Sequence, residues 1–203
     1  MAQSKPFQLF TVDEYLEQER SSEVRHEYLD GHIYEMAGES GPHGDITVNL
    51  VISLGSQLKG TLCRVRSKDT KVRSGPDPKP YQGTSGLYSY PDVVVVCGEP
   101  QYHDDHADVI LNPSVILEVL SPATEAFDRG KKFTRYQIWN STLSDYLLVL
   151  QNSPQVEHYT RQSKDSWSYC RAAGLETEIS IASIDCVLKL ADIYDRIAFK
   201  LDE

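Results

Sequence analysis

YPDVVVVC at residues 90–97 and SVILEVLS at residues 114–121 are two short apolar runs that read as buried β-strands, and each carries one acid. Asp92 follows a proline at the start of four valines, whereas Glu118 lies inside its apolar run. An unpaired carboxylate buried in a strand is costly, so Glu118 needs a partner, a raised pKa or a metal ion. If the two strands are neighbours, Asp92 and Glu118 can converge on one divalent cation, since hard ions such as Mg²⁺ bind one or two carboxylates together with water and phosphate.

A basic helix is expected over residues 128–139, shortly after the second strand. Asp128, Lys132 and Tyr136 are spaced by four, so they lie on one helical face. One interpretation is a solvent-exposed helix that is stabilised by ion pairs. The alternative is that the aromatic residues of the helix pack against the core, which would let a neighbouring lysine point into a cleft.

The composition is that of an acidic globular protein. A chain of 203 residues with 40% apolar and 25% charged residues can bury a substantial core, so we expect a single domain over residues 1–203 with a loose tail at residues 1–10. The net charge of -10 argues against a protein that coats nucleic acid by overall charge. Basic segments at residues 64–73 and 129–135 fit a contact that is limited to one site.

The four cysteines, Cys63, Cys97, Cys170 and Cys186, form no C-x-x-C pair and have no histidine at zinc-finger spacing. A structural zinc site is therefore not expected, and we interpret the cysteines as buried free thiols. The N-terminal residues include no apolar stretch of signal-peptide length, and no segment is long enough to span a bilayer. These features predict a cytoplasmic protein in a reducing compartment, without membrane attachment.

Other segments alternate between helical and strand patterns. The Asp30-Gly31 turn predicts a β-hairpin over residues 26–36, because both turn positions tolerate positive φ. A helix should begin with a capping box at Thr11 and Glu14. The acidic loop at residues 103–108, which also contains histidine, is interpreted as solvated rather than catalytic. Further elements are expected as a helix at 43–59, strands at 62–66, 70–73, 146–150, 156–160, 167–171 and 178–181, and a short helix at 190–194.

Five motifs occur in the order found in the Uma2 family (DUF820), a family of restriction-endonuclease-like proteins that is abundant in cyanobacteria and belongs to the PD-(D/E)xK nuclease superfamily. They are EYLDG at residues 27–31, a helix from His43, YPDV at 90–93, LEVLSP at 117–122 and DRGKK at 128–132. Each motif alone is weak, but together they make the chain resemble this family over nearly its whole length. The resemblance implies an α/β (α+β) fold with a restriction-endonuclease-like αβββαβ core, in which helices flank a central mixed sheet, and an extra N-terminal β-hairpin.

The resemblance also implies a metal-dependent site. It makes Asp92 and Glu118 ligands of Mg²⁺, for which Mn²⁺ can substitute, and adds Glu27 as a catalytic residue near the same cleft. The superfamily's catalytic lysine normally lies two residues after the second acid, where this chain has Leu120. In the Uma2 pattern the lysine is displaced onto the next helix, and Lys132 is the matching residue.

Two accessory residues are expected beside this site. His43 matches a family position, although a histidine that simply starts a helix or fills the core would fit the sequence equally well. Tyr136 shares the helical face of Lys132.

The implied function is that of a Mg²⁺-dependent endodeoxyribonuclease that hydrolyses phosphodiester bonds, with nucleic acid, expected to be DNA, as its partner. Cleavage of both strands of a duplex would favour a homodimer. The alternative is a catalytically silent module of the same fold that binds nucleic acid or a protein partner, which the negative net charge and Leu120 favour. A third interpretation is a structural network in which Asp92 and Glu118 pair with Lys132 and Arg135.

Overall fold

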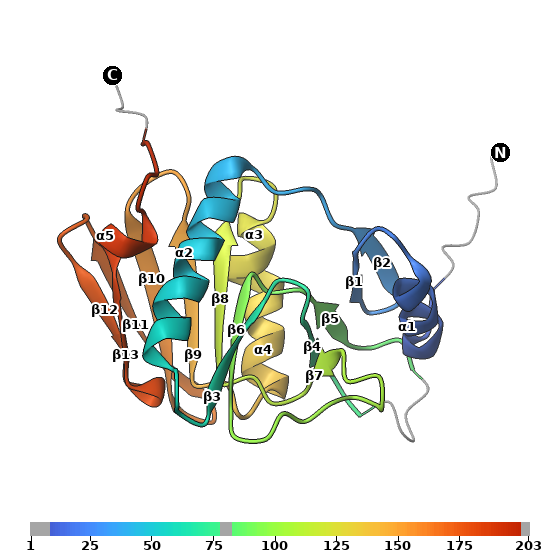
Figure 1. The fold of residues 1–203 in the computed structure, drawn as a ribbon. Helices are drawn as coiled ribbons and strands as arrows, with labels where there is room; N and C mark the ends of the chain where they lie inside the picture. Colours follow the sequence, from blue (N-terminus) through green and yellow to red (C-terminus); the bar gives the residue numbers. More distant parts are fainter. Residues whose placement is uncertain (1–8, 78–82, 200–203) are drawn as a thin grey trace.

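Figure 1 shows a computed structural model of the chain, which describes residues 9–77 and 83–199. Residues 1–8 of the expected N-terminal tail lie outside the described residues, as do residues 78–82 and 200–203. The described chain forms three β-sheets with helices packed against them, and this confirms the predicted mixed α/β class.

The largest sheet has six strands in the order β11-β10-β9-β8-β6-β3. Their bounds are β3 Cys63–Ser67, β6 Val93–Cys97, β8 Val115–Leu120, β9 Asp145–Leu150, β10 Gln155–Ser163 and β11 Ser166–Ala173. Strands β8 and β9 are parallel, whereas the other neighbours are antiparallel. The two apolar runs of the sequence are the neighbouring strands β6 and β8, and every residue of β8 is buried.

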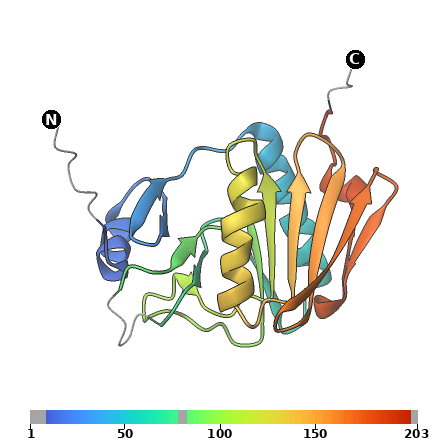
Figure 2. The same cartoon turned by 180° about the vertical axis from the view of Figure 1, so that it is seen from behind.

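Helices cover both faces of this sheet (Figures 1 and 2). On one face, Ile46, Leu50 and Leu54 of α2 (Gly41–Gln57) pack on the sheet. The small sheet of β12 (Glu178–Ile181) and β13 (Cys186–Lys189), the 3-10 turn η2 (Ala182–Ile184) and α5 (Leu190–Ile193) complete the same cluster. The opposite face is covered by one continuous helical segment, which consists of α3 (Glu125–Phe127), the π-helical turn η1 (Asp128–Lys132) and α4 (Phe133–Trp139).

A second sheet of five strands has the order β2-β1-β5-β4-β7. Its strands are β1 His26–Leu29, β2 His32–Glu35, β4 Lys71–Ser74, β5 Leu87–Ser89 and β7 Val109–Ile110, and α1 (Val12–Ser21) packs on it. Val72 and Leu87 of this sheet belong to the same buried cluster as Phe133 and Tyr136 of α4. The segment from η1 to α4 therefore packs against both sheets.

Local sequence signals account for several of these elements. The capping box is confirmed, because the Glu14 N–H donates to the Thr11 hydroxyl and the Glu14 carboxylate accepts from the Thr11 N–H. The hairpin is confirmed as well, with Asp30 and Gly31 at φ 48° and 89°. The predicted helix at residues 128–139 is present, but its first five residues form a π-turn.

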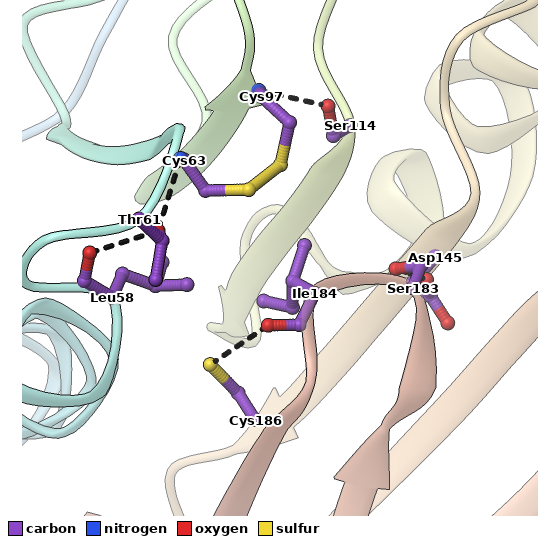
Figure 3. The surroundings of a disulfide bond; sticks show 9 residues. All are labelled: Leu58, Thr61, Cys63, Cys97, Ser114, Asp145, Ser183, Ile184 and Cys186. Carbon is purple, nitrogen blue, oxygen red and sulfur yellow. Dashed lines mark hydrogen bonds between the residues drawn. A yellow bond between two sulfur atoms is a disulfide. The ribbon is translucent and has the colours of Figure 1, made fainter.

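The interpretation of all four cysteines as buried free thiols is wrong. Cys63 and Cys97 face each other on the antiparallel strands β3 and β6 and form a disulfide (Figure 3). Cys170 is free but exposed, and only Cys186 is a buried free thiol. Sequence separation conceals the pair, because the sheet register brings together two positions that are 34 residues apart in the chain. The disulfide also removes free thiols as a reason to expect a reducing compartment.

In the described part of the chain, none of the helices combines the length and the apolar character that a bilayer crossing requires.

Candidate functional site

The side chain of Lys132 lies at the centre of a cluster of acids. Its Nζ atom is 2.9 Å from Glu118 Oε1, 3.2 Å from Asp128 Oδ1 and 3.4 Å from Glu27 Oε1. The lysine side chain is only 5% exposed, so these contacts are almost completely shielded from water. Burial of an ammonium group is costly unless carboxylates compensate it, and here three of them do.

The three acids around Lys132 come from different elements. Glu118 is in β8 and has the same side-chain direction as Ile116 and Leu120, which pack in the cluster beneath α4. Glu27 is in β1 of the smaller sheet, where the Tyr90 N–H donates to its Oε1 atom at 3.1 Å. Lys132 therefore joins the two sheets through ion pairs.

Asp92 precedes β6 by one residue and is held beside β8. The Val119 N–H donates to Asp92 Oδ2 at 2.7 Å, and His43 Nε2 lies 2.8 Å from Asp92 Oδ1. His43 is in the first turn of α2, where Ser40 is the N-cap residue. The side chains of Asp92 and His43 are 15% and 14% exposed, so they are more accessible to solvent than Glu118 and Asp128, which are each 4% exposed.

The pKa values of the site reflect burial and crowding of like charges. Burial raises the pKa of Glu118 well above its usual range, and the carboxylates of Asp128 and Asp92 raise it further against the opposing effect of Lys132. Burial would lower the pKa of Lys132, but Glu118, Glu27 and Asp128 outweigh it and raise that pKa. Lys132 is therefore an ammonium ion at neutral pH, and Asp92 lies close enough to Glu118 to act on its ionisation.

Burial alone would also lower the pKa of His43, but the carboxylate of Asp92 raises it above its usual value. The imidazole is thus held toward its protonated form by the acid that it contacts.

Tyr136 contacts the site from α4. Its hydroxyl donates to Glu118 Oε1 at 3.4 Å and lies 2.8 Å from the Ser89 hydroxyl of β5. Burial raises the pKa of Tyr136, so the phenol remains protonated and available as a donor.

The donor set fits a hard divalent cation. We refer to Glu27, Asp92, Glu118 and Asp128 as the four acids. In the described residues, these acids contact only two groups that can carry positive charge, Lys132 and His43. No three His, Cys, Asp or Glu side chains of residues 9–77 and 83–199 form a ready-made ligand set. Mg²⁺ does not need one, since it binds one or two carboxylates and completes its shell with water and phosphate.

The structure thus brings together the residues that the sequence singled out. Lys132 contacts Glu27 and Glu118, Tyr136 contacts Glu118, and Asp92 and His43 form the adjoining pair. Asp128 was not assigned to the site, although its i,i+4 spacing from Lys132 was a usable signal. For Ser89, the sequence holds no comparable signal.

Two groups of residues lie apart from the four acids. The structural-network interpretation expects Arg135 to pair with Asp92 or Glu118. In the structure, Arg135 pairs instead with Asp30 of the hairpin turn. In the loop at residues 103–108, Asp104 and Asp108 both pair with Arg20 at the end of α1.

The sequence matches a family profile and two related proteins. Residues 12–190 match the profile of the Uma2 family, which is described as "Putative restriction endonuclease". The chain is 34% identical over 196 residues to the uncharacterized protein slr1290 of Synechocystis sp. strain PCC 6803, with 97% of each chain covered. It is 30% identical over 174 residues to the uncharacterized protein sll1609 of the same organism, with 86% of this chain and 93% of that protein covered.

A solved structure shares the fold. The crystal structure of "a putative nuclease belonging to DUF820" from Anabaena variabilis ATCC 29413 superposes with a TM-score of 0.72 at 17% sequence identity. The superposition covers 93% of this chain and 99% of that chain. It confirms the predicted restriction-endonuclease-like arrangement of sheets and helices.

Proposed function

The chain belongs to the Uma2 family, and on that premise we propose that it is an endonuclease that uses Mg²⁺ to hydrolyse phosphodiester bonds of DNA. The family description supports nuclease chemistry in general. The cation and the nucleic acid are inferred from the chemistry of the residues that this chain places together.

The excess of carboxylates in the site carries the proposal. Even with His43 protonated, the four acids outnumber the positive groups they contact two to one. This excess, together with burial, is what raises the pKa of Glu118. At low pH a proton relieves the repulsion between the four acids, whereas at neutral pH a divalent cation would do so. Such a cation can also bind a phosphodiester, which acidic side chains alone would repel.

Each residue then has a definite task. Asp92 and Glu118 would hold the cation, which supplies positive charge to orient the scissile phosphate and to acidify a water molecule. The Val119 N–H and His43 fix the orientation of the Asp92 carboxylate. Lys132 places an ammonium beside Glu118, where it can stabilise negative charge that develops on the phosphate.

The test is to replace each proposed ligand by its amide. We expect Asp92→Asn and Glu118→Gln each to lower the rate of Mg²⁺-dependent plasmid cleavage by about 10²- to 10³-fold or more. Both amides keep the shape of the acid, so circular dichroism and thermal melting should show a retained fold. Glu178→Gln, an exposed acid of β12, is the matched control and should cleave like the wild type. Full activity in either site variant would refute the assignment.

A catalytically silent binding module is the second candidate, and Leu120 at the usual position of the lysine favours it. Calorimetric titration with Mg²⁺ or Mn²⁺ separates the two. A nuclease site binds the cation and loses that binding in Asp92→Asn, whereas a silent module binds nucleic acid without taking up the ion.

Assays with duplex DNA, single-stranded DNA and RNA in parallel identify the substrate. Sedimentation of the active protein tests the homodimer that duplex cleavage favours.

A further inference from the structure

The lysine of the site has one partner on its own helical segment. Asp128 and Lys132 are the first and last residues of the π-turn η1, and their side chains form an i,i+4 ion pair of 3.2 Å. Both other carboxylates that contact Lys132 belong to β-strands. A π-turn inside an otherwise α-helical segment is rare and frequently marks a functional site.

Asp128 is as deeply buried as the residues proposed for catalysis. Its side chain is 4% exposed, and Lys132 is the one ion-pair partner that it has among the described residues. The backbone of the same residue is fixed as well, since the Tyr146 hydroxyl of β9 donates to the Asp128 carbonyl at 3.0 Å. The carboxylate thus occupies a rigid position beside the ammonium without contacting Asp92.

Glu118, the acid nearest to Lys132, would change its role when a cation binds, which would leave Asp128 and the more distant Glu27 as partners of the lysine. Glu118 lies 2.9 Å from Lys132 in the structure, and as a proposed ligand it would turn toward the incoming ion. Two positive charges near one carboxylate repel each other, so the ammonium would then be driven away from the position where it can act. A carboxylate that is held on the helix of the lysine, and that is not a ligand, prevents this displacement.

We propose that Asp128 is a positioning residue, which retains the Lys132 ammonium beside the scissile phosphate when Glu118 exchanges its contact with the lysine for the metal ion. This inference rests on the proposed function. In the superfamily motif, the lysine lies two residues after the second acid. In this chain, the acid that holds the lysine would be Asp128, which lies with Lys132 in the same π-turn η1. Asp128 touches neither the substrate nor the cation, and it acts only through Lys132.

The test measures the lysine directly. The rate at which a lysine-acetylating reagent modifies Lys132 is followed by mass spectrometry, with and without saturating Mg²⁺ and without nucleic acid. In the wild type, Lys132 should remain slow to react in both states. In Asp128→Asn it should be nearly as slow without Mg²⁺, where Glu118 and Glu27 remain as partners, and about tenfold or more faster with Mg²⁺, as expected for one lost charge-assisted hydrogen bond.

Two further variants define the effect. Asp128→Glu keeps a carboxylate at the same i,i+4 spacing and should restore slow modification in the presence of Mg²⁺. Glu125→Gln removes an acid of the same helical segment that pairs with Arg129 at the surface, and it should behave like the wild type. Thermal melting of each variant establishes that it is folded. In cleavage assays, Asp128→Asn should lower kcat while leaving KM nearly unchanged.

The outcomes separate this inference from the proposed function. If Asp128→Asn binds Mg²⁺ normally and its Lys132 still reacts slowly, the positioning role is overturned while the proposed function stands. A Mg²⁺ affinity that falls by about tenfold or more in Asp128→Asn shows that Asp128 acts on the cation, as a ligand or as a residue that orients one, and also overturns it. Fast modification of Lys132 in this variant regardless of Mg²⁺ assigns Asp128 a merely structural role. Failure of the wild type to bind Mg²⁺ overturns the proposed function, and this inference with it.

Discussion

At the scale of single residues, the buried ammonium of Lys132 contacts three carboxylates. Replacement of Lys132 by methionine would leave these acids with like charges and without their positively charged partner, so we expect the free energy of unfolding to fall by about 3–5 kcal/mol in the absence of metal. Mg²⁺ should recover part of this loss, because it binds the folded state and neutralises the same acids. Urea denaturation with and without Mg²⁺ measures both effects.

Lys131→Met is the matched control for that experiment, since Lys131 is the exposed neighbour in the same turn. It should unfold like the wild type. A Lys132→Met protein as stable as this control would contradict the prediction.

Asp108 gives a pH-dependent prediction outside the site. Its carboxylate lies 2.8 Å from Arg20 Nη2 and 2.9 Å from Lys71 Nζ. Burial would raise the pKa of Asp108, but Arg20 and Lys71 outweigh it and hold the pKa well below its usual range. A lowered pKa in the folded state contributes stability above the unfolded pKa of about 3.9, and this stability is lost as the pH falls toward the folded value.

We therefore expect Asp108→Asn to be less stable than the wild type by about 1–3 kcal/mol at pH 7, with the difference shrinking as the pH falls below about 4. Urea denaturation over this pH range provides the measurement. The neighbouring Asp105 is exposed, so Asp105→Asn should show no such pH dependence. A difference that grows in acid would contradict the assignment.

The sequence could predict the candidate residues of the site but not all of their contacts. Asp92 and Glu118 stood out because an acid in an apolar strand requires a reason, and Lys132 because it follows on a helix with an apolar side. The pairing of Asp92 with His43 depends on how α2 docks against the end of β8, which no local pattern encodes. The strand pattern by itself connects Asp92 with Glu118, whereas His43 is expected at the site only from the Uma2 resemblance.

At the scale of elements, the disulfide between β3 and β6 can be tested by stability. Cys63 and Cys97 close a loop with a sequence separation of 34. Loop-closure entropy for this length predicts a loss of about 3–4 kcal/mol in the Cys63→Ala/Cys97→Ala double variant. Chemical denaturation under non-reducing conditions measures the loss, and reduction of the wild type should reproduce most of it. Cys170→Ser, at an exposed free cysteine, serves as the control, and an unchanged double variant would contradict the prediction.

Elements with strong local signals were predicted well, and elements that depend on distant partners were not. The capping box of α1 and the Asp-Gly turn of the hairpin are determined by neighbouring residues, and both are confirmed. Strand β7 has two residues and exists only because it pairs with β4, so no periodicity could reveal it. The π-turn was missed for a related reason, since its sequence remains compatible with an α-helix.

At the scale of the whole molecule, most of the basic residues in the two predicted basic segments, 64–73 and 129–135, are already paired with acids. In the described chain, Arg129 contacts Glu125 and Glu157, Lys68 contacts Glu39, and the other basic residues with ion pairs are Arg20, Arg25, Lys71, Arg73, Lys132, Arg135 and Arg196. The predicted basic segments therefore leave few cations for phosphates. The negative net charge of -10 makes a wide electrostatic footprint still less favourable.

This charge distribution predicts a shallow salt dependence of nucleic-acid binding. The logarithm of the binding constant should fall with the logarithm of salt concentration with a slope of about -1 to -3, as expected for one to three phosphate contacts. Fluorescence anisotropy with labelled DNA, in Ca²⁺ to avoid cleavage, gives the slope. A slope near -8 would contradict this prediction, because it corresponds to about nine phosphate contacts.

The overall class of the fold was predictable, but the division into sheets was not. The sequence predicted one central mixed sheet with a hairpin in front of it, whereas the hairpin strands β1 and β2 belong to a five-stranded sheet with β4, β5 and β7. Alternating residues identify a strand, but they do not identify its neighbours. That choice follows from how α4 packs between the two sheets.

The position of Lys132 between the two sheets has a consequence for protein engineering. Its acid partners lie on two different sheets, Glu27 on the five-stranded sheet and Glu118 on the six-stranded sheet. The distances from Lys132 to both acids are therefore correct only if the two sheets are matched to each other. A chimaera assembled from two relatives should take both layers from the same parent. A crossover between residues 36 and 63 would take Glu27 from one parent and Glu118 and Lys132 from the other, and it would also divide the five-stranded sheet between the two parents.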